Sequence, residues 1–313
     1  MERNKKRKQT LIVVLSVFVL LVLSISVDAQ TEQPFSYTQY MDNLAPINPA
    51  YSLLDQAGSI NTLASKQLIG INGSPTSFLI NGDVPLSSIT SSAGFSLLSD
   101  QLAIEKEIEL NAYFAKAIQV GPEDYLAVSL NAGFRNYTAL YSSLEGSQQD
   151  QEFSVDVRQT KPNVGFGIMY YTDWYYIGLS VPELTVTSLG TASVQNNNNN
   201  FSNHYYFAAA MLTSMGEDFK FKPAALVSYS SGVPVLADLS GTIYLKEILG
   251  VGVNFGTDKT MAGILTLNFD QFHVGYSYKF SIGTQDLGGV NNATNEVTLY
   301  YRFGKGSSTP KLL

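Results

Sequence analysis

The sequence alternates apolar and polar residues over much of its length, and this two-residue period limits the possible folds more than any other feature. In Tyr125–Arg135 the even positions are Leu, Val, Leu, Ala and Phe, whereas the odd positions are mostly small or polar. Residues 107–114, 272–280 and 295–303 follow the same rule. Because successive side chains of a strand point to opposite faces, each segment is expected to be a β-strand with one apolar and one polar face.

The length of these segments and the position of their aromatic residues favour a membrane barrel over a β-sandwich. The segments run to about 9–11 residues, the length of a tilted transmembrane strand, whereas average strands have about 5–6. Bands of aromatic residues mark the two membrane boundaries of such barrels. Aromatic residues stand at the ends of the expected strands at Tyr137, Tyr170, Trp174, Phe269, Phe272 and Phe280.

The sequence therefore predicts an all-β fold, a transmembrane antiparallel β-barrel of about 14 strands within residues 59–303. The expected strands cover residues 59–66, 77–82, 93–100, 107–117, 124–137, 163–170, 174–181, 204–214, 219–230, 234–244, 249–256, 260–269, 272–280 and 295–303. Long connections are expected at one end only, at 138–162, 182–203 and 281–294. Outer loops of such barrels are longer than periplasmic turns, so both termini should lie in the periplasm.

The N-terminus has the layout of a secretory signal peptide over residues 1–29. Basic residues precede a 17-residue apolar stretch, Leu11–Val27, and Val27-Asp28-Ala29 offers small residues for cleavage before Gln30. An uncleaved anchor helix is the alternative, because 17 residues come close to spanning a bilayer. Cleavage removes five basic and two acidic side chains and takes the net charge from −7 to −10. At the other end, residues 304–313 are expected to form a flexible tail.

Composition excludes several classes of function. The chain has no cysteine, which rules out disulfide scaffolds, thiol enzymes and a lipoprotein anchor. Its net charge of −7 is opposite to that of a nucleic-acid binder. One hypothesis is a hydrolase that uses His204, which follows Asn203, together with a serine. A loop or boundary histidine is the preferred interpretation, and we expect no enzyme activity and no catalytic, cofactor-binding or metal-binding residue.

Two groups of residues are candidates for contacts with partners. Residues 30–58 precede the barrel and are expected either to plug its lumen or to contact a periplasmic partner. The residues of interest in this segment are Pro34, Phe35, Tyr40, Asn48, Pro49 and Tyr51. The residues expected to face a partner from the outer loops are Tyr141, Glu145, Asp150, Glu152, Asp156, Asn198 and His204.

Several short motifs, in their order and spacing, resemble those of a known family. Pro34–Tyr40 and Asn48-Pro49-Ala50-Tyr51 lie close to the expected mature start. Further motifs are Lys66-Gln67, Gly73–Thr76, Tyr175–Pro182, Lys222-Pro223, Gly232–Pro234, Asp238 and Gly275–Tyr278. Together they make residues 33–303 similar to the PorP/SprF family, outer-membrane proteins of the type IX secretion system of Bacteroidota. Ser52 departs from the glycine that often follows this motif, which affects only the local turn.

The resemblance implies a fourteen-stranded barrel, similar to fatty-acid-transporter barrels, in the outer membrane of a Gram-negative bacterium after Sec-type export. It also implies a role in secretion, gliding or adhesion. The expected partners are a large secreted adhesin, bound through its C-terminal sorting domain, other secretion-system components and the lipid bilayer. The alternative function is an outer-membrane channel for small or hydrophobic molecules, because fold alone does not set function.

Overall fold

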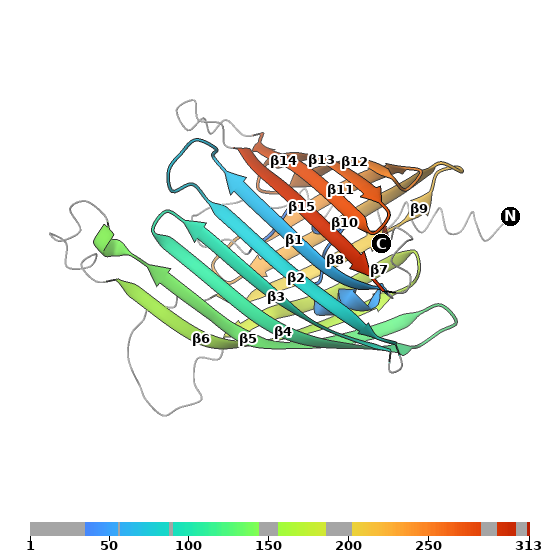
Figure 1. The fold of residues 1–313 in the computed structure, drawn as a ribbon, viewed down its shortest axis with the longest axis horizontal. Coiled ribbons are helices and arrows are strands. Elements are labelled where there is room, and N and C mark those ends of the chain that lie inside the picture. Colours follow the sequence, from blue (N-terminus) through green and yellow to red (C-terminus); the bar gives the residue numbers. More distant parts are fainter. Residues whose placement is uncertain are drawn as a thin grey trace.

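The chain forms a closed antiparallel β-barrel (Figure 1). The computed structural model describes residues 35–55, 57–87, 90–143, 156–185, 202–282, 293–304 and 312–313. Its strands are β1 (Gly58–Gln67), β2 (Thr76–Leu86), β3 (Ser91–Leu102), β4 (Glu105–Gln119), β5 (Tyr125–Ala139), β6 (Val157–Tyr171), β7 (Tyr175–Thr185), β8 (His204–Met211), β9 (Thr213–Ser214), β10 (Phe219–Ser230), β11 (Leu236–Leu245), β12 (Leu249–Gly256), β13 (Thr260–Phe269), β14 (Phe272–Ser281) and β15 (Ala293–Phe303). The expected signal peptide at residues 1–29 and Pro34 lie outside the described residues.

Closure of the barrel follows from the strand pairing. Each wall strand pairs with its neighbour in the sequence, and β1 pairs with β15 from Gly58↔Phe303 to Gln67↔Thr294. Strands β8 and β9 are two parts of one wall strand, since both pair with β10. The barrel therefore has fourteen wall strands in the described part of the chain, which confirms the predicted fold.

Three strands run further toward the outer end than predicted. β5 and β6 have 15 residues each, and β7 continues to Thr185. The predicted loops at 138–162 and 182–203 are therefore too long at their edges. Pro162 and Pro182 stand at the edges of these predicted loops, and proline cannot donate to a strand ladder. However, Pro162 lies where β6 pairs only with β5, and Pro182 lies at a register shift in β7, and proline is tolerated at both kinds of position.

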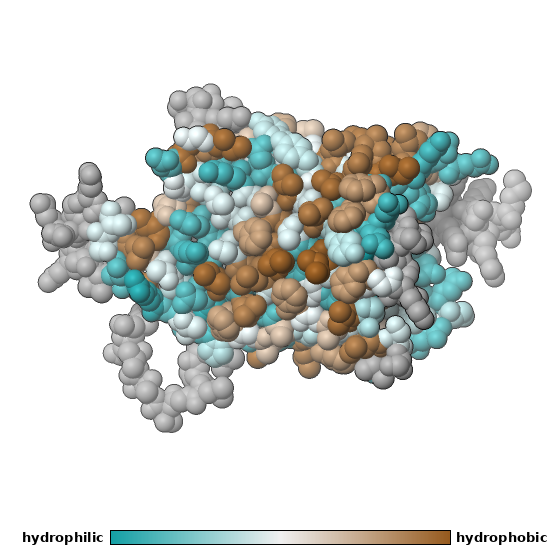
Figure 2. Space-filling view, in the orientation of Figure 1, coloured by the Kyte–Doolittle hydropathy of each residue, from teal (hydrophilic) through white to brown (hydrophobic). Residues whose placement is uncertain are grey.

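The alternating sequence pattern separates the two faces of the wall as predicted. On β5, Val128 and Leu130 are exposed, whereas Ala127, Ser129 and Asn131 point inward and are buried. Figure 2 shows apolar side chains gathered in a broad band across the visible face of the barrel, with hydrophilic residues toward both ends. Such a band is the lipid-facing surface of an outer-membrane-type barrel.

Aromatic pairs edge this band, and at the outer end Tyr205 lies 5.9 Å from Tyr229 between ring centres. Near the end with the short turns, Phe269 stacks on Phe272 with ring centres 5.5 Å apart, and Trp174 lies 4.4 Å from Tyr175. Tyr137, which the sequence placed in a boundary band, is instead buried. It occupies an odd position of β5, and odd positions of this strand face the interior.

The N-terminal segment from residue 35 to residue 57, here called the inner segment, lies inside the barrel (Figure 1, blue). It contains one short 3-10 helix, η1 (Pro49–Leu53), which contacts β2, β3, β4, β5 and β6. Tyr40, Met41 and Leu44 are completely buried.

The end of the chain is also buried. Leu312 and Leu313 are 5% and 4% exposed, and Leu313 belongs to the same apolar cluster as the inner segment. The expected flexible tail at 304–313 therefore ends in two buried residues. None of the helices in the described part of the chain is long and apolar enough to cross a membrane.

Candidate functional site

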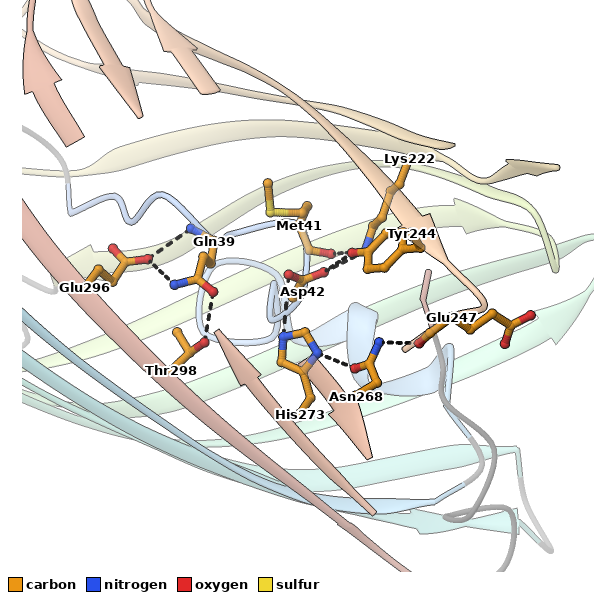
Figure 3. Close-up of polar contacts among 10 residues, drawn as sticks. All are labelled: Gln39, Met41, Asp42, Lys222, Tyr244, Glu247, Asn268, His273, Glu296 and Thr298. Atoms are coloured by element: carbon orange, nitrogen blue, oxygen red, sulfur yellow. Dashed lines mark hydrogen bonds and ion pairs between the residues drawn. The ribbon is translucent and has the colours of Figure 1, made fainter. Parts of the chain in front are cut away.

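The inner segment is attached to the wall by a buried ionic group around Asp42 (Figure 3). Lys222 of β10 donates to Asp42 Oδ1 at 3.0 Å and to the carbonyl of Met41 at 2.6 Å. Tyr244 of β11 donates to the same carboxylate at 3.2 Å, and His273 of β14 lies 3.7 Å from it. Burial raises the pKa of the Asp42 carboxyl, but Lys222 and His273 outweigh burial and leave that pKa below its ordinary value.

A second attachment joins the segment to β15. The carboxylate of Glu296 accepts hydrogen bonds from the backbone N–H groups of Thr38 and Gln39, both at 3.1 Å. The side chain of Gln39 donates to the same carboxylate at 3.3 Å and accepts from Thr298 at 3.0 Å. Figure 3 shows Gln39 between the two wall residues. A buried carboxylate is stable only with such donors, so the wall and the segment depend on each other here.

The Asn48-Pro49 motif holds η1 against the opposite wall. The side chain of Asn48 caps the helix by accepting from the N–H of Ala50 at 3.2 Å. Its amide group also donates to the carbonyls of Ile168 on β6 and Leu179 on β7, at 3.2 and 3.3 Å. Asn48 therefore links the fold of the segment to its position in the barrel.

The remaining aromatic residues of the segment contact the wall directly. Tyr40 donates to the carbonyl of Asp238 at 3.1 Å, and burial holds the pKa of its hydroxyl well above the ordinary value, so Tyr40 stays neutral. Tyr51 packs edge-on against Tyr176, with ring centres 5.6 Å apart. The carbonyl of Phe35 accepts from Tyr206 at 3.1 Å.

Two small cavities lie beside these contacts. A cavity of about 40 Å³ lies at the end with the short turns, where Asp55, Arg302, Leu312 and Leu313 help to line it. A second cavity of about 20 Å³ lies beside Gln39 and Thr298. Spaces of this size hold one or two water molecules. The inner segment therefore fills the part of the interior in which these two cavities lie.

A second buried charge cluster, here called the mouth cluster, lies at the outer end of the barrel. Its centre is Arg135 on β5, which is 2% exposed. Arg135 pairs with Glu107 of β4 at 2.7 Å and with Glu183 of β7 at 3.0 Å. It also donates to the carbonyl of Ser202, directly before β8, at 3.2 Å. The cluster thus joins the roots of the two predicted long loops.

A β-bulge brings Glu183 into the mouth cluster. In regular alternation Ile177 and Leu179 of β7 face the membrane, and residue 183 would do the same. The pairing of β7 shifts by one residue opposite Val164 and Phe166, so Glu183 turns inward and is buried. Bulges commonly re-aim one side chain in this way. The sequence analysis did not predict that Arg135 and Glu183 form a buried ion pair at the outer end.

The predicted loop residues have different locations. His204 is not on a loop: it is the first residue of β8, 4% exposed, and its ring lies 3.9 Å from Glu183. Tyr141 begins the short helix η3 (Tyr141–Ser143) and packs against the buried Tyr137 and Ala139. Asp156 accepts from the N–H of Ser142 at 3.0 Å, and this hydrogen bond lowers the pKa of its carboxyl. Glu145, Asp150, Glu152 and Asn198 lie outside the described residues.

The described residues contain no group of three or more His, Cys, Asp or Glu side chains arranged to hold a metal ion. The mouth cluster and the inner segment are instead ion pairs and hydrogen bonds within the protein. These contacts position the inner segment and the outer ends of the strands.

The chain is similar to one protein family and to several solved structures. A family model described as type IX secretion system membrane protein PorP/SprF matches residues 29–301. No curated sequence matches significantly. Among solved structures, Omp33 of Acinetobacter baumannii is 7% identical with a TM-score of 0.47, over 80% of this chain and 99% of that one. A FadL homologue of Pseudomonas aeruginosa is 11% identical with a TM-score of 0.47, over 88% and 100%. The CymD monoaromatic hydrocarbon channel is 12% identical with a TM-score of 0.48, over 85% and 93%.

Proposed function

The chain belongs to the PorP/SprF family of type IX secretion membrane proteins, and from this premise we propose that its outer end binds the C-terminal sorting domain of a secreted adhesin-type cargo. The protein is an outer-membrane β-barrel of the type IX secretion system and acts with other components of that system. The proposed step is capture of the exported cargo at the cell surface. It requires a binding surface and no chemical reaction.

The inner segment inside the lumen is the observation that best supports binding over transport. The inner segment is tied to β10, β11, β14 and β15 by buried charged and polar contacts. A substrate channel would require that these contacts break together. The role of the barrel in this proposal is to carry a recognition surface in the membrane, with the lumen occupied by its own chain.

Buried ion pairs at the outer end connect the strands that carry the two long connections. The connections from β5 to β6 and from β7 to β8 both start from strands that the mouth cluster ties together. Asp156 and η3 join the two ends of the first connection. Loops that recognise a partner are effective when a rigid scaffold positions them, and these loops have such a base.

The test is to delete the gene in the native bacterium and to compare the surface proteins of the mutant with those of the parent. We expect that a large protein with a C-terminal sorting domain is lost from the surface and regained with the wild-type gene. The same protein should be captured by the purified barrel through its isolated sorting domain. If all such proteins remain at the surface and none binds the purified barrel, the proposal is wrong.

Two control measurements separate the alternative functions. A channel predicts a selective current from the wild-type barrel in planar bilayers, whereas the proposal predicts none. A hydrolase predicts loss of function in His204→Gln, whereas the proposal predicts that this variant restores cargo display, since His204 is buried.

A further inference from the structure

The outer end of β6 extends past the strand that follows it in the wall. β6 pairs with β5 along its whole length, from Tyr125↔Tyr171 to Ala139↔Val157. On its other side, the pairing with β7 reaches only to Asn163↔Thr185. Within the described part of the chain, no strand therefore pairs with this side of residues 157–160, here called the open edge. Figure 1 shows β5 and β6 projecting further at the outer end than β1 to β4.

The open edge directs backbone hydrogen-bonding groups away from the barrel wall. Alternate residues of an antiparallel strand point their N–H and C=O groups to opposite sides. The carbonyl of Gln159 points toward β5, where a side-chain amide of that strand donates to it at 3.4 Å. Lower on the strand, the carbonyl of the even-numbered Ile168 meets that of Leu179 between β6 and β7, since one amide donates to both. The backbone groups of Arg158 and Thr160 therefore point to the open edge.

The open edge lies beyond the apolar band of its own strand. The outward-facing residues of β6 are Arg158, Thr160 and Pro162, followed by Val164 and Phe166. The large apolar residues exposed on this strand begin at Val164. A strand rises about 3.3 Å per residue, so Thr160 lies about 13 Å further along β6 than Val164. Backbone groups at this distance from the band are accessible to a protein outside the membrane.

Neighbouring strands and side chains hold the open edge in an extended form. β4 pairs with β5 as far as Ala139, so β4, β5 and β6 form a continuous ladder up to these residues. On the inner face, Val157 packs against the buried Tyr137 and Ala139. On the outer face, the hydroxyl of Thr160 accepts from the amide of Asn136 at 2.7 Å. A preformed edge lowers the conformational entropy that is lost on binding.

We propose that the open edge binds the cargo by β-strand addition, in which an extended strand of the C-terminal sorting domain pairs with β6 beyond the end of β7. This inference rests on the proposed function and supplies its mode of recognition. An exposed edge with alternating donors and acceptors is a template for another extended backbone, and strand addition is a recurrent form of recognition. Pro162 sets the lower limit of the added pairing, because it has no N–H to donate.

A second copy of the barrel is a poorer occupant of the open edge. Two copies in the same membrane hold equivalent residues at the same height, so paired edges would bring two Arg158 side chains close together. Like charges in this arrangement destabilise a strand pair, and a charged residue on an exposed edge is a common protection against self-pairing. A strand of another protein has no such restriction.

The test compares two substitutions at Thr160 in the purified full-length barrel. Thr160→Pro removes the N–H on the open edge and keeps the ladder with β5, as the natural Pro162 does two residues away. Thr160→Val is the matched control, because it loses the same hydroxyl and keeps the N–H. The ligand is the isolated sorting domain of the surface protein that is lost when the gene is deleted. We expect Thr160→Pro to bind it about tenfold more weakly, and Thr160→Val to bind within about twofold of the wild type.

A second measurement needs no variant. The amide groups of Arg158 and Thr160 should exchange hydrogen rapidly in the free wild-type barrel and become protected when the sorting domain binds. The inference is wrong if these amides are already protected in the free barrel, because the protein itself then covers the edge. It is also wrong if folded Thr160→Pro binds as tightly as the wild type. A wild-type barrel that binds no sorting domain would refute the proposed function, and this inference with it. Heat-resistant migration in SDS shows whether each variant is folded.

Discussion

The contact between Lys222 and Asp42 is the residue pair on which the inner segment depends most strongly. The Lys222 side chain is 1% exposed and the Asp42 side chain is 14% exposed. Removing one partner of such a pair leaves an uncompensated buried charge, which costs far more than the pair contributes when intact. The two residues are also 180 positions apart in the sequence, so the pair joins two distant parts of the fold.

Lys222→Met is expected to loosen the inner segment by about 3–5 kcal/mol, because it leaves Asp42 buried without its main counter-charge. The measurement is the rate at which a protease cleaves the segment in the intact purified barrel. The control is Lys220→Met on the same strand, which breaks a half-exposed pair with Glu247 and should cost less than about 1 kcal/mol. Equal cleavage rates in the two variants would show that the Asp42 pair does not hold the segment.

The lowered pKa of Asp42 predicts how this attachment responds to acid. Because the pKa in the folded protein lies below the ordinary value of about 3.9, ionised Asp42 stabilises the fold at every pH above that value. The contribution is lost as the pH falls through the lowered pKa. We expect the thermal midpoint of the wild type to fall below about pH 4 more steeply than that of Asp42→Asn. Parallel curves for the two proteins between pH 2 and pH 7 would contradict this assignment.

At the level of whole elements, small residues in the wall make room for the inner segment. A side chain at Gly275 of β14 would collide with the amide of Gln39, and one at Gly167 of β6 would collide with Asn48. Both glycines face the interior, so their role is to permit close approach of the segment. The small residues of these wall strands thus fit the inner segment.

Gly275→Ala is therefore expected to displace the part of the segment around Gln39 and to lower the thermal midpoint of the barrel. The matched control is Gly263→Ala on the neighbouring β13, where an added Cβ meets no atom within 4 Å. Hydrogen exchange of residues 37–42 reports the displacement directly. If both variants show wild-type exchange in this segment, the close packing against Gly275 has no energetic importance.

Features that depend on neighbouring residues could be predicted from the sequence, whereas contacts between residues far apart in the sequence could not. Alternation is a local signal, and it correctly predicted the strands and the faces on which Leu130 and Ser129 lie. The alternation in β8 could also have placed His204 inside the barrel. Its even-numbered residues share one face, and Tyr206 and Ala208 on that face are buried. The inward turn of Glu183 depends on one extra residue in β7, and no local pattern reveals which residue a bulge adds. Pairs such as Gln39 and Glu296, 257 residues apart, require the closed barrel itself.

For the molecule as a whole, the inner segment occupies the lumen of a barrel with a polar lining. The wall that surrounds it is polar, with Asn61, Asn81, Asn254 and Ser277 all buried on the inner face. A fourteen-stranded barrel with an empty polar interior has room for an aqueous path. The protein is thus a potential pore that its own chain fills.

Deleting residues 35–50 is expected to convert the silent barrel into one that passes a steady current in planar bilayers. The wild-type protein is the control, and heat-resistant migration in SDS shows whether the deleted form is folded. Should the deletion prevent folding, the double variant Gly275→Ala, Glu296→Gln weakens the segment without shortening the chain. A folded deletion variant that conducts no more than the wild type would show that the segment does not close the lumen.

The long sequence separation between the inner segment and its wall contacts has a consequence for biogenesis. Residues 38–42 leave the translocon early, yet the groups that bind them are on β10, β11, β14 and β15, which emerge much later. The segment can reach its final position only after the last hairpins have been inserted. This short stretch therefore becomes ordered in the last step of assembly. An antibody against it would bind unfinished barrels and would not bind completed ones.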